Sequence, residues 1–319
     1  MIGMDYKIEK FSAPYLNSLT KLLDQSFSIQ NKNKSQLVKW KYFDEFFRNQ
    51  TITYIAFNQS NEVISHYANL PISISYQNEI YKAMVCTDMC TDPRYRGRGL
   101  ISKLSAEVYK QVKKKSYDLS IGFSNDEGVK VDKNYKEYGY VVVGKFVRYF
   151  KVIVSRKKIN YKLVRTDTIK NTFSYINSKY FRIKKDVEFL NWRYIKKPRS
   201  EYDVYNILED NQAVGYVILR FINKRCYIYD IVCGLEDKSN MVNILRSIEN
   251  KALDHDSRII IYNVLDNKYW IELFNRYKYF KKTRNKVDYH LTVKIHQNFP
   301  NEDLVLNKEN WLMMNGDMI

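Results

Sequence analysis

The segment from Met84 to Leu104 restricts the fold of this chain more than any other part of its sequence. An apolar stretch with the residue types of a β-strand ends at Asp92-Pro93, and a helical pattern begins at Leu100. The basic loop between them contains Gly97 and Gly99, which can adopt left-handed conformations and let a ligand approach the main chain. A helix N-terminus adds free N–H groups and the positive end of a dipole. This succession predicts an anion cradle that fits a pyrophosphate.

The glycine pattern alone leaves a second interpretation open, which is a tight strand-to-helix turn without a ligand. The sequence Gly-Lys-Ser/Thr does not follow, so the loop is not a P-loop. The glycine spacing also differs from that of a dinucleotide-binding fingerprint. The choice between these two interpretations of the loop therefore depends on the predicted elements around it.

Hydrophobic periodicity predicts the order β-α-α-β-β-β-α-β-α-β for the first half of the chain. The predicted strands cover residues 6–11, 51–57, 63–75, 80–91, 117–123 and 140–154, and the predicted helices cover 15–27, 35–43, 100–115 and 127–138.

The second half repeats this pattern weakly, which predicts a duplicated fold. Val38-Lys39-Trp40-Lys41-Tyr42 matches Leu190-Asn191-Trp192-Arg193-Tyr194, and Thr87-Asp88-Met89-Cys90 aligns with Tyr229-Asp230-Ile231-Val232. A helix over 241–251 and a strand over 258–264 follow in the second copy. The basic stretch 155–158 predicts a boundary between a domain of residues 1–154 and a domain of residues 155–319. The alternative is a chance similarity between two mixed α/β domains.

The strand, the Pro-x-Tyr-Arg-Gly-x-Gly loop, the helix, the next strand, Asn125 and a helix ending in Tyr-Gly-Tyr together resemble the GNAT superfamily of acetyl-CoA-dependent N-acetyltransferases. The resemblance covers about residues 5 to 150, and its family pattern is [QR]-x-x-G-x-[GA]. The chain departs from this pattern at the last position, which is Ile101. The fold implied is α/β (α+β), with tandem GNAT-like domains that each hold a mixed, mostly antiparallel central sheet flanked by helices.

By this resemblance, acetyl-CoA is the donor substrate and no metal is required. Main-chain groups of Met89, Cys90 and Thr91 would bind the pantetheine arm. The loop would hold the pyrophosphate through a run of seven residues: Arg96, Gly97, Arg98, Gly99, Leu100, Ile101 and Ser102. Asn125 would contact the cofactor where the sheet splays open, or else cap the following helix.

Direct attack of an amine on a thioester needs an acid and a base. By the resemblance, the acid is Tyr135, with Tyr138 as the alternative, although either ring could simply pack in a Tyr-rich chain. The candidate base is Asp88, which strand alternation places on the face of Cys86 and Cys90. Apolar neighbours would raise its pKa. Asp88 could instead be a buried hydrogen-bond partner, and His66 is another candidate base.

The second copy lacks the cofactor loop, because a segment with one glycine and two acidic residues, 234–240, takes its place. Phe274 replaces Tyr135 and Lys278 replaces Gly139. We therefore expect a degenerate domain that shapes the acceptor pocket. The apolar segment 310–317 is expected to dock between the domains, where Asp317 could touch the acceptor.

Charge and cysteine content restrict the partners. The net charge of +18, from 53 basic and 35 acidic residues, attracts anions. It keeps an aminoacyl-tRNA-dependent transferase open as an alternative, although the chain has no recognised nucleic-acid motif and its lysines are scattered. The four cysteines form no C-x-x-C pair, which predicts reduced, buried thiols and a cytoplasmic setting. No apolar run reaches the ~18 residues of a membrane span.

The predicted function is acetyl transfer from acetyl-CoA to the primary amine of a small molecule, for which an amino sugar or a nucleotide-linked amino sugar is one candidate. A non-catalytic CoA-binding module is the further alternative. The sequence leaves the oligomeric state open.

Overall fold

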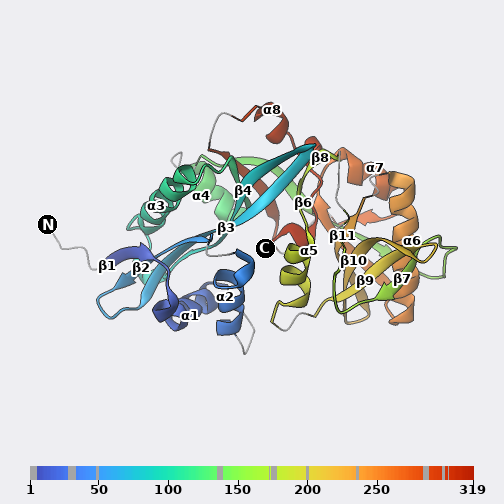
Figure 1. Cartoon of the computed structure of the whole chain (residues 1–319), viewed down its shortest axis with the longest axis horizontal. Helices are drawn as coiled ribbons and strands as arrows, with labels where there is room; N and C mark the ends of the chain where they lie inside the picture. The colour runs from blue at the N-terminus through green and yellow to red at the C-terminus, as the bar shows by residue number, and fades with distance from the viewer. Residues whose placement is uncertain are drawn as a thin grey trace.

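The computed structural model describes residues 6–27, 34–47, 50–134, 139–171, 173, 178–198, 201–234, 237–282, 287–296, 299–300 and 302–319, without the side chains of 131–134. Two lobes lie side by side, and the C-terminal segment runs between them (Figure 1). The mixed, mostly antiparallel sheet flanked by helices confirms the predicted fold class.

The first lobe follows the predicted element order. Its elements are β1 (Tyr6–Lys10), α1 (Leu16–Phe27), α2 (Lys34–Tyr42), β2 (Ile52–Asn58), β3 (Val63–Gln77), β4 (Glu79–Thr91), α3 (Leu100–Lys114), β5 (Leu119–Asn125), α4 (Asp126–Asn134) and β6 (Val141–Val152). Figure 1 shows α1 and α2 on one face of the sheet and α3 and α4 on the other. Leu104, Val108 and Val112 turn the apolar stripe of α3 toward the sheet and are fully buried.

The second lobe repeats the arrangement. Its elements are β7 (Lys162–Arg165), β8 (Ser178–Ile183), α5 (Val187–Leu190) with a π-helical continuation (Asn191–Ile195), β9 (Asp203–Glu209), β10 (Gln212–Ile222), β11 (Arg225–Cys233), α6 (Lys238–Asp254), β12 (Ile259–Leu265), α7 (Lys268–Arg276), β13 (Phe280–Lys281), β14 (Tyr289–Ile295) and α8 (Glu302–Val305). Lys278 has a φ of 58°, close to the 59° of Gly139, with which the repeat aligns it.

The two lobes exchange strands. The hydrogen-bonded order is β1-β2-β3-β4-β5-β14-β6-β12-β11-β10-β9-β7, so β14 from the second half lies between β5 and β6 of the first. Strand β6 pairs with β14 through residues 141–145 and with β12 through residues 146–152. Strand β8 also crosses over and pairs with β3. The division into domains of residues 1–154 and 155–319 stays a prediction. Strands from each of these two ranges form main-chain hydrogen bonds within the sheet of the other.

Two repeat-related tryptophans join the lobes in a symmetric contact. The rings of Trp40 and Trp192 stack with centroids 4.5 Å apart and an interplanar angle of 10°. Trp40 Nε1 donates to the Trp192 carbonyl at 2.9 Å, and Trp192 Nε1 donates to the Trp40 carbonyl at 3.2 Å. The segments that the sequence repeat aligns are therefore in direct contact, and the stack belongs to a core cluster with residues of both halves.

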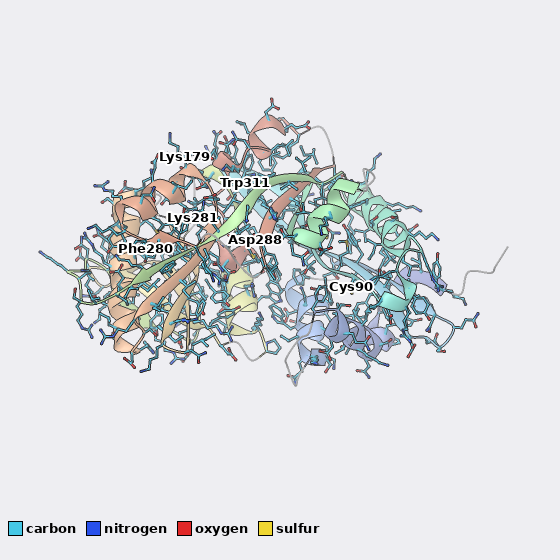
Figure 2. The ribbon with its side chains drawn as sticks, turned by 180° about the vertical axis from the view of Figure 1, so that it is seen from behind. Cys90, Lys179, Phe280, Lys281, Asp288 and Trp311 are labelled. Carbon is cyan, nitrogen blue, oxygen red and sulfur yellow. The ribbon has the colours of Figure 1, made fainter. Side chains whose placement is uncertain are left out.

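Toward the chain end, Trp311 also lies in this core, between the lobe of Cys90 and the lobe of Phe280 (Figure 2). Its indole nitrogen donates to the Val305 carbonyl at 2.7 Å, and its ring is fully buried. The expected docking of the apolar segment 310–317 is thus observed.

We predict that Trp192→Ala lowers the free energy of unfolding by about 3–5 kcal/mol, because the change leaves a large cavity in the shared core. Trp192→Phe keeps a ring but loses the donor to Trp40, and should cost less. Chemical denaturation of both variants measures the difference. A loss below about 1 kcal/mol for Trp192→Ala would contradict a joining role for the stack.

Candidate functional site

Strands β4 and β5 diverge at the predicted pantetheine site. Their parallel pairing runs from Ala83–Leu119 to Cys86–Gly122 and includes no later residue pair. Strand β4 nevertheless continues to Thr91, paired on its other side with β3. Within the described chain, no strand pairs with residues 87–91 on the side of β5. Met89, Cys90 and Thr91 thus lie on a length of strand with one free edge.

A β-bulge accompanies this divergence and corrects the expected strand alternation. His66 faces Cys90 and Ala68 faces Thr87, so one residue of β3 opposes two of β4. Asp88 lies in the bulge with a φ of 51°. The prediction that Asp88 shares a face with both Cys86 and Cys90 therefore holds only for Cys90, because the extra residue breaks the period of two. Cys90 packs in the core cluster of Tyr42, the partner of Asp88, whereas Cys86 packs against the cluster on the opposite face.

The glycine loop has the conformation that an anion cradle requires. Gly97 and Gly99 have φ values of 76° and 68°, in the left-handed region. A Cβ atom at either position would have no heavy atom within 4 Å, so both face open space. Gly99 is the N-cap residue of α3 and supplies no side-chain cap, which leaves the first-turn amides uncapped.

The three loop arginines differ in their contacts. Arg94 is bound to Asp92, whose carboxylate lies 2.7 Å from its Nη2. Arg96 Nε donates to the Thr91 carbonyl at 3.3 Å, and the guanidinium of Arg98 lies 5.0 Å from the centre of the Tyr95 ring. Neither Arg96 nor Arg98 forms an ion pair with a described residue, so their charges remain available at the mouth of the loop.

The corresponding helix of the second copy is closed to an anion. Asp237, the N-cap residue of α6, accepts from the N–H groups of Ser239 at 2.9 Å and Asn240 at 3.2 Å. The carboxylate of Asp237 thus caps the first-turn amides of α6, whereas the equivalent amides of α3 stay uncapped. Its negative charge would also repel a phosphate. This contrast agrees with the expectation that only the first copy holds the cofactor loop.

Asn125 shows one of its two expected roles. It ends β5, and its Oδ1 accepts from the N–H of Gly128 at 2.8 Å. The side chain is therefore a cap for α4, as one of the two interpretations had it. A contact with a cofactor stays a prediction.

Asp88 lies at the centre of a polar cluster that the sequence did not suggest. Lys41 Nζ lies 2.9 Å from the carboxylate, and the Tyr42 hydroxyl donates to it at 2.5 Å. His66 Nδ1 lies 2.8 Å from the Asp88 carbonyl oxygen. The side chain of Asp88 is 22% exposed. The repeat contained a signal for part of this cluster, because Tyr194 donates to Asp230 in the second copy at 2.6 Å.

The expected rise in the pKa of Asp88 is wrong. Burial does raise the pKa, but the charge of Lys41, the hydrogen bond from Tyr42 and the proximity of His66 outweigh it. The pKa of the carboxyl therefore lies below its ordinary value. His66 is fully buried, and burial lowers its pKa to about 4 in spite of its contacts with Asp88. At neutral pH the cluster thus combines an ionised carboxylate with a neutral imidazole.

The position equivalent to Asp88 in the second copy is filled by protein. Lys185 Nζ lies 2.8 Å from Asp230 and 2.7 Å from Asp317, and all three side chains are buried. A Cβ atom at Gly316 would overlap the Tyr194 hydroxyl and reach within 2.7 Å of Asp230. The turn at 315–317 therefore occupies this site, and Asp317 points into an internal ion pair.

Tyr135 and Tyr138, the candidate acids, lie outside the described residues. Burial raises the pKa of the Cys90 thiol to about 12, which leaves it protonated. None of the four cysteines forms a disulfide, and three of them are buried. Within the described ranges, no three His, Cys, Asp or Glu side chains are grouped as metal ligands. No helix of the described chain is long and apolar enough to cross a membrane.

Comparison with known proteins finds a family match for the first lobe. Residues 7–143 match a family model described as an acetyltransferase (GNAT) domain. No curated protein matches the chain. A GCN5-related N-acetyltransferase from Anabaena variabilis has a TM-score of 0.67 at 13% identity, with 92% of this chain and 73% of that chain covered.

Two further structures extend the likeness in fold. A probable N-acyltransferase from Enterococcus faecalis gives a TM-score of 0.66 at 13% identity, over 91% of this chain and 72% of that chain. The N-myristoyltransferase of Saccharomyces cerevisiae gives 0.61 at 9% identity, over 92% and 80%. Because each match covers more than nine-tenths of the chain, the shared architecture includes both lobes.

The buried neutral imidazole predicts a pH dependence of stability. The unfolded chain protonates His66 near pH 6.5, whereas the folded chain does so near pH 4. Between these values the unfolded state binds more protons, so stability falls as the pH falls, by up to about 1.4 kcal/mol per pH unit. We expect His66→Gln to flatten the wild-type profile in this window. Urea denaturation between pH 4 and 7.5 checks this, and parallel profiles would contradict it.

Proposed function

We propose that the chain is an acyltransferase of the GNAT family, whose domain model matches residues 7–143, and that it transfers the acetyl group of acetyl-CoA directly to the primary amine of a small molecule. One observation carries this proposal. The free edge of β4 at 87–91 leads directly into an uncapped helix N-terminus at Gly99. An extended ligand that ends in a pyrophosphate matches both features.

In the proposed complex, the donor lies along the opening between β4 and β5. Main-chain groups of Met89, Cys90 and Thr91 would pair with the amides of the pantetheine arm, as an added strand would. The N–H groups from Gly97 to Ser102 would bind the pyrophosphate, and the exposed guanidinium groups of Arg96 and Arg98 would add charge. Asn125, at the end of β5, would border the cofactor while it caps α4.

The reaction joins the amine nitrogen to the thioester carbonyl carbon and breaks the carbon–sulfur bond. The nitrogen loses one proton and the departing CoA thiolate gains one. We propose Asp88 as the group that attracts the acceptor ammonium and takes up its proton, because its carboxylate is ionised at neutral pH. His66 is the alternative base, since its imidazole is neutral there. Tyr135 is the proposed acid.

The second lobe is proposed to be a degenerate copy without a donor site. Asp237 caps its helix, and the turn at 315–317 fills the position equivalent to Asp88. Its contribution would be the wall of the acceptor pocket, because α2 and the π-helical segment 191–195 meet at the Trp40–Trp192 stack.

We predict that the wild-type chain binds acetyl-CoA with micromolar affinity and that Gly97→Glu and Gly99→Glu abolish this binding. A carboxylate in the cradle repels the pyrophosphate, and a side chain at these φ values strains the loop. Isothermal titration calorimetry measures the affinity. Gly97→Ala separates strain from charge, and Lys162→Glu on the distant β7 controls for added charge. Failure of the wild type to bind would overturn the proposed donor and return attention to aminoacyl-tRNA.

Substitution of the proposed acid and base should reduce turnover without loss of donor binding. We expect Asp88→Asn and Tyr135→Phe each to lower kcat by about 10²–10³-fold, the usual contribution of a positioned acid or base. Release of free CoA thiol, followed with an amine panel, measures the rate. Tyr138→Phe tests the alternative acid, and a loss of turnover in that variant alone would assign the role to Tyr138. Unchanged rates in both variants would contradict these roles, and a chain that binds acetyl-CoA without turnover would be a binding module.

A further inference from the structure

A basic residue without a carboxylate partner lies between the two lobes. Lys197 Nζ is 5.5 Å from the ring centre of Trp40, in α2 of the first lobe, and 5.5 Å from that of Tyr202, next to β9 of the second. Among the described residues no acidic group forms an ion pair with it. Two aromatic faces from different halves of the chain thus enclose a single ammonium group.

The other charges that act on Lys197 are also positive. The pKa of Lys197 is lowered to about 7, mostly by burial and in smaller part by the charges of Arg193, Lys41 and Arg220. Lys41 is neutralised by Asp88, and Arg220 pairs with Glu201. The positive charges of Lys197 and Arg193 therefore have no such compensation in the described chain.

Arg193 is almost fully buried, with 4% of its surface exposed. Its Nη2 donates to the Met318 carbonyl at 2.8 Å, but its Nε is buried with no hydrogen-bond partner among the described residues. The nearby carboxylates of Asp230 and Asp317 are bound by Lys185. A buried guanidinium with an unsatisfied N–H is costly unless an anion reaches it.

This cluster adjoins the proposed reaction centre. Lys41, whose charge acts on Lys197, contacts both the carboxylate of Asp88 and the hydroxyl of Thr87. Thr87 in turn lies 3.2 Å from the main-chain oxygen of Ile319, next to Met318, which accepts from Arg193.

We propose that the acceptor amine carries an anionic group, a carboxylate or a phosphate, which binds between Lys197 and Arg193 while Trp40 and Tyr202 contact the rest of the molecule. This inference rests on the proposed function, and it names the acceptor class of that same site. The amine would then lie toward Asp88, so that one end of the acceptor meets the surplus positive charge and the other meets the ionised carboxylate. Opposite charges at the two ends orient the acceptor for attack.

The test uses calorimetric titration of the full-length chain, with and without saturating CoA, against two matched pairs of amines. Glucosamine 6-phosphate is compared with glucosamine, and phenylalanine with phenylalaninamide. In at least one pair, the anionic member should bind about tenfold or more tightly than the neutral member, the usual effect of one charge-assisted hydrogen bond. The pair that responds distinguishes phosphate from carboxylate.

Lys197→Gln should remove this preference and leave acetyl-CoA affinity unchanged, whereas Lys196→Gln, at the exposed neighbouring position, should alter neither. Arg193→Gln is the second variant, and its thermal unfolding is measured because the side chain is buried. Equal binding within both pairs, or no binding of any anionic amine, would overturn the inference. So would a loss of acetyl-CoA affinity in Lys197→Gln, which would assign the site to the donor.

The two proposals fail separately. If acetyl-CoA does not bind but an anionic amine binds in a manner that depends on Lys197, the anion site stands and the proposed donor is wrong. If acetyl-CoA binds and is lost in Gly97→Glu while no charge preference exists, the donor site stands and the acceptor class is wrong.

Discussion

The exchange of strands between the lobes is the constraint on which the rest of the structure depends. Strand β14 completes the first sheet between β5 and β6, and the far end of β6 completes the second sheet beside β12. Neither sheet is complete without a strand from the other half of the chain. The lobes are therefore held in one orientation, which brings Lys41 and Arg193 close enough for their charges to act on Lys197. Because residues about 150 positions apart must pair, we expect folding to depend on contacts of high sequence separation.

Because the second lobe repeats the order of elements of the first, the two lobes can be compared within one molecule. Both copies have a strand that leads into a long helix, but the first helix begins at an uncapped left-handed glycine and the second at Asp237. Both copies bind a strand aspartate through a tyrosine hydroxyl, but Asp88 is partly exposed and Asp230 is enclosed. The difference between an open site and a closed one is thus made by a few side chains on a shared backbone.

Much of the fold was predictable from sequence because its signals are local. Apolar periodicity located the helices and strands of the first lobe, and the positive φ of Gly97 and Gly99 follows from the residue type itself. The aligned Trp40 and Trp192 segments indicated the repeated arrangement of elements. The position of β14 between β5 and β6 was not predictable from the sequence. An antiparallel strand has the same sequence pattern and the same hydrogen-bond pattern whichever lobe supplies its neighbours.

The candidate site was predictable only in part, for a related reason. The cradle is one continuous segment, whereas the environment of Asp88 is assembled from α2, β3 and β4. The bulge that gives Asp88 a φ of 51° leaves no mark in a single sequence, so alternation placed Asp88 correctly relative to Cys90 and wrongly relative to Cys86. Lys41, which lies 47 positions from Asp88 in the sequence, lowers the pKa of Asp88. The apolar neighbours of Asp88 in the strand had predicted a higher pKa instead.

The turn at 315–317 limits what a single substitution could change in the second lobe. Gly316 lies against Tyr194 and Asp230 so closely that a single methyl group would not fit. In the second lobe, the protein's own main chain therefore occupies the position that corresponds to the surroundings of Asp88. A substitution that removed Asp237 would free the helix amides but would leave that position filled. Under the proposed roles, a donor and acceptor site in the second lobe would need several simultaneous changes, so no single substitution could create one there.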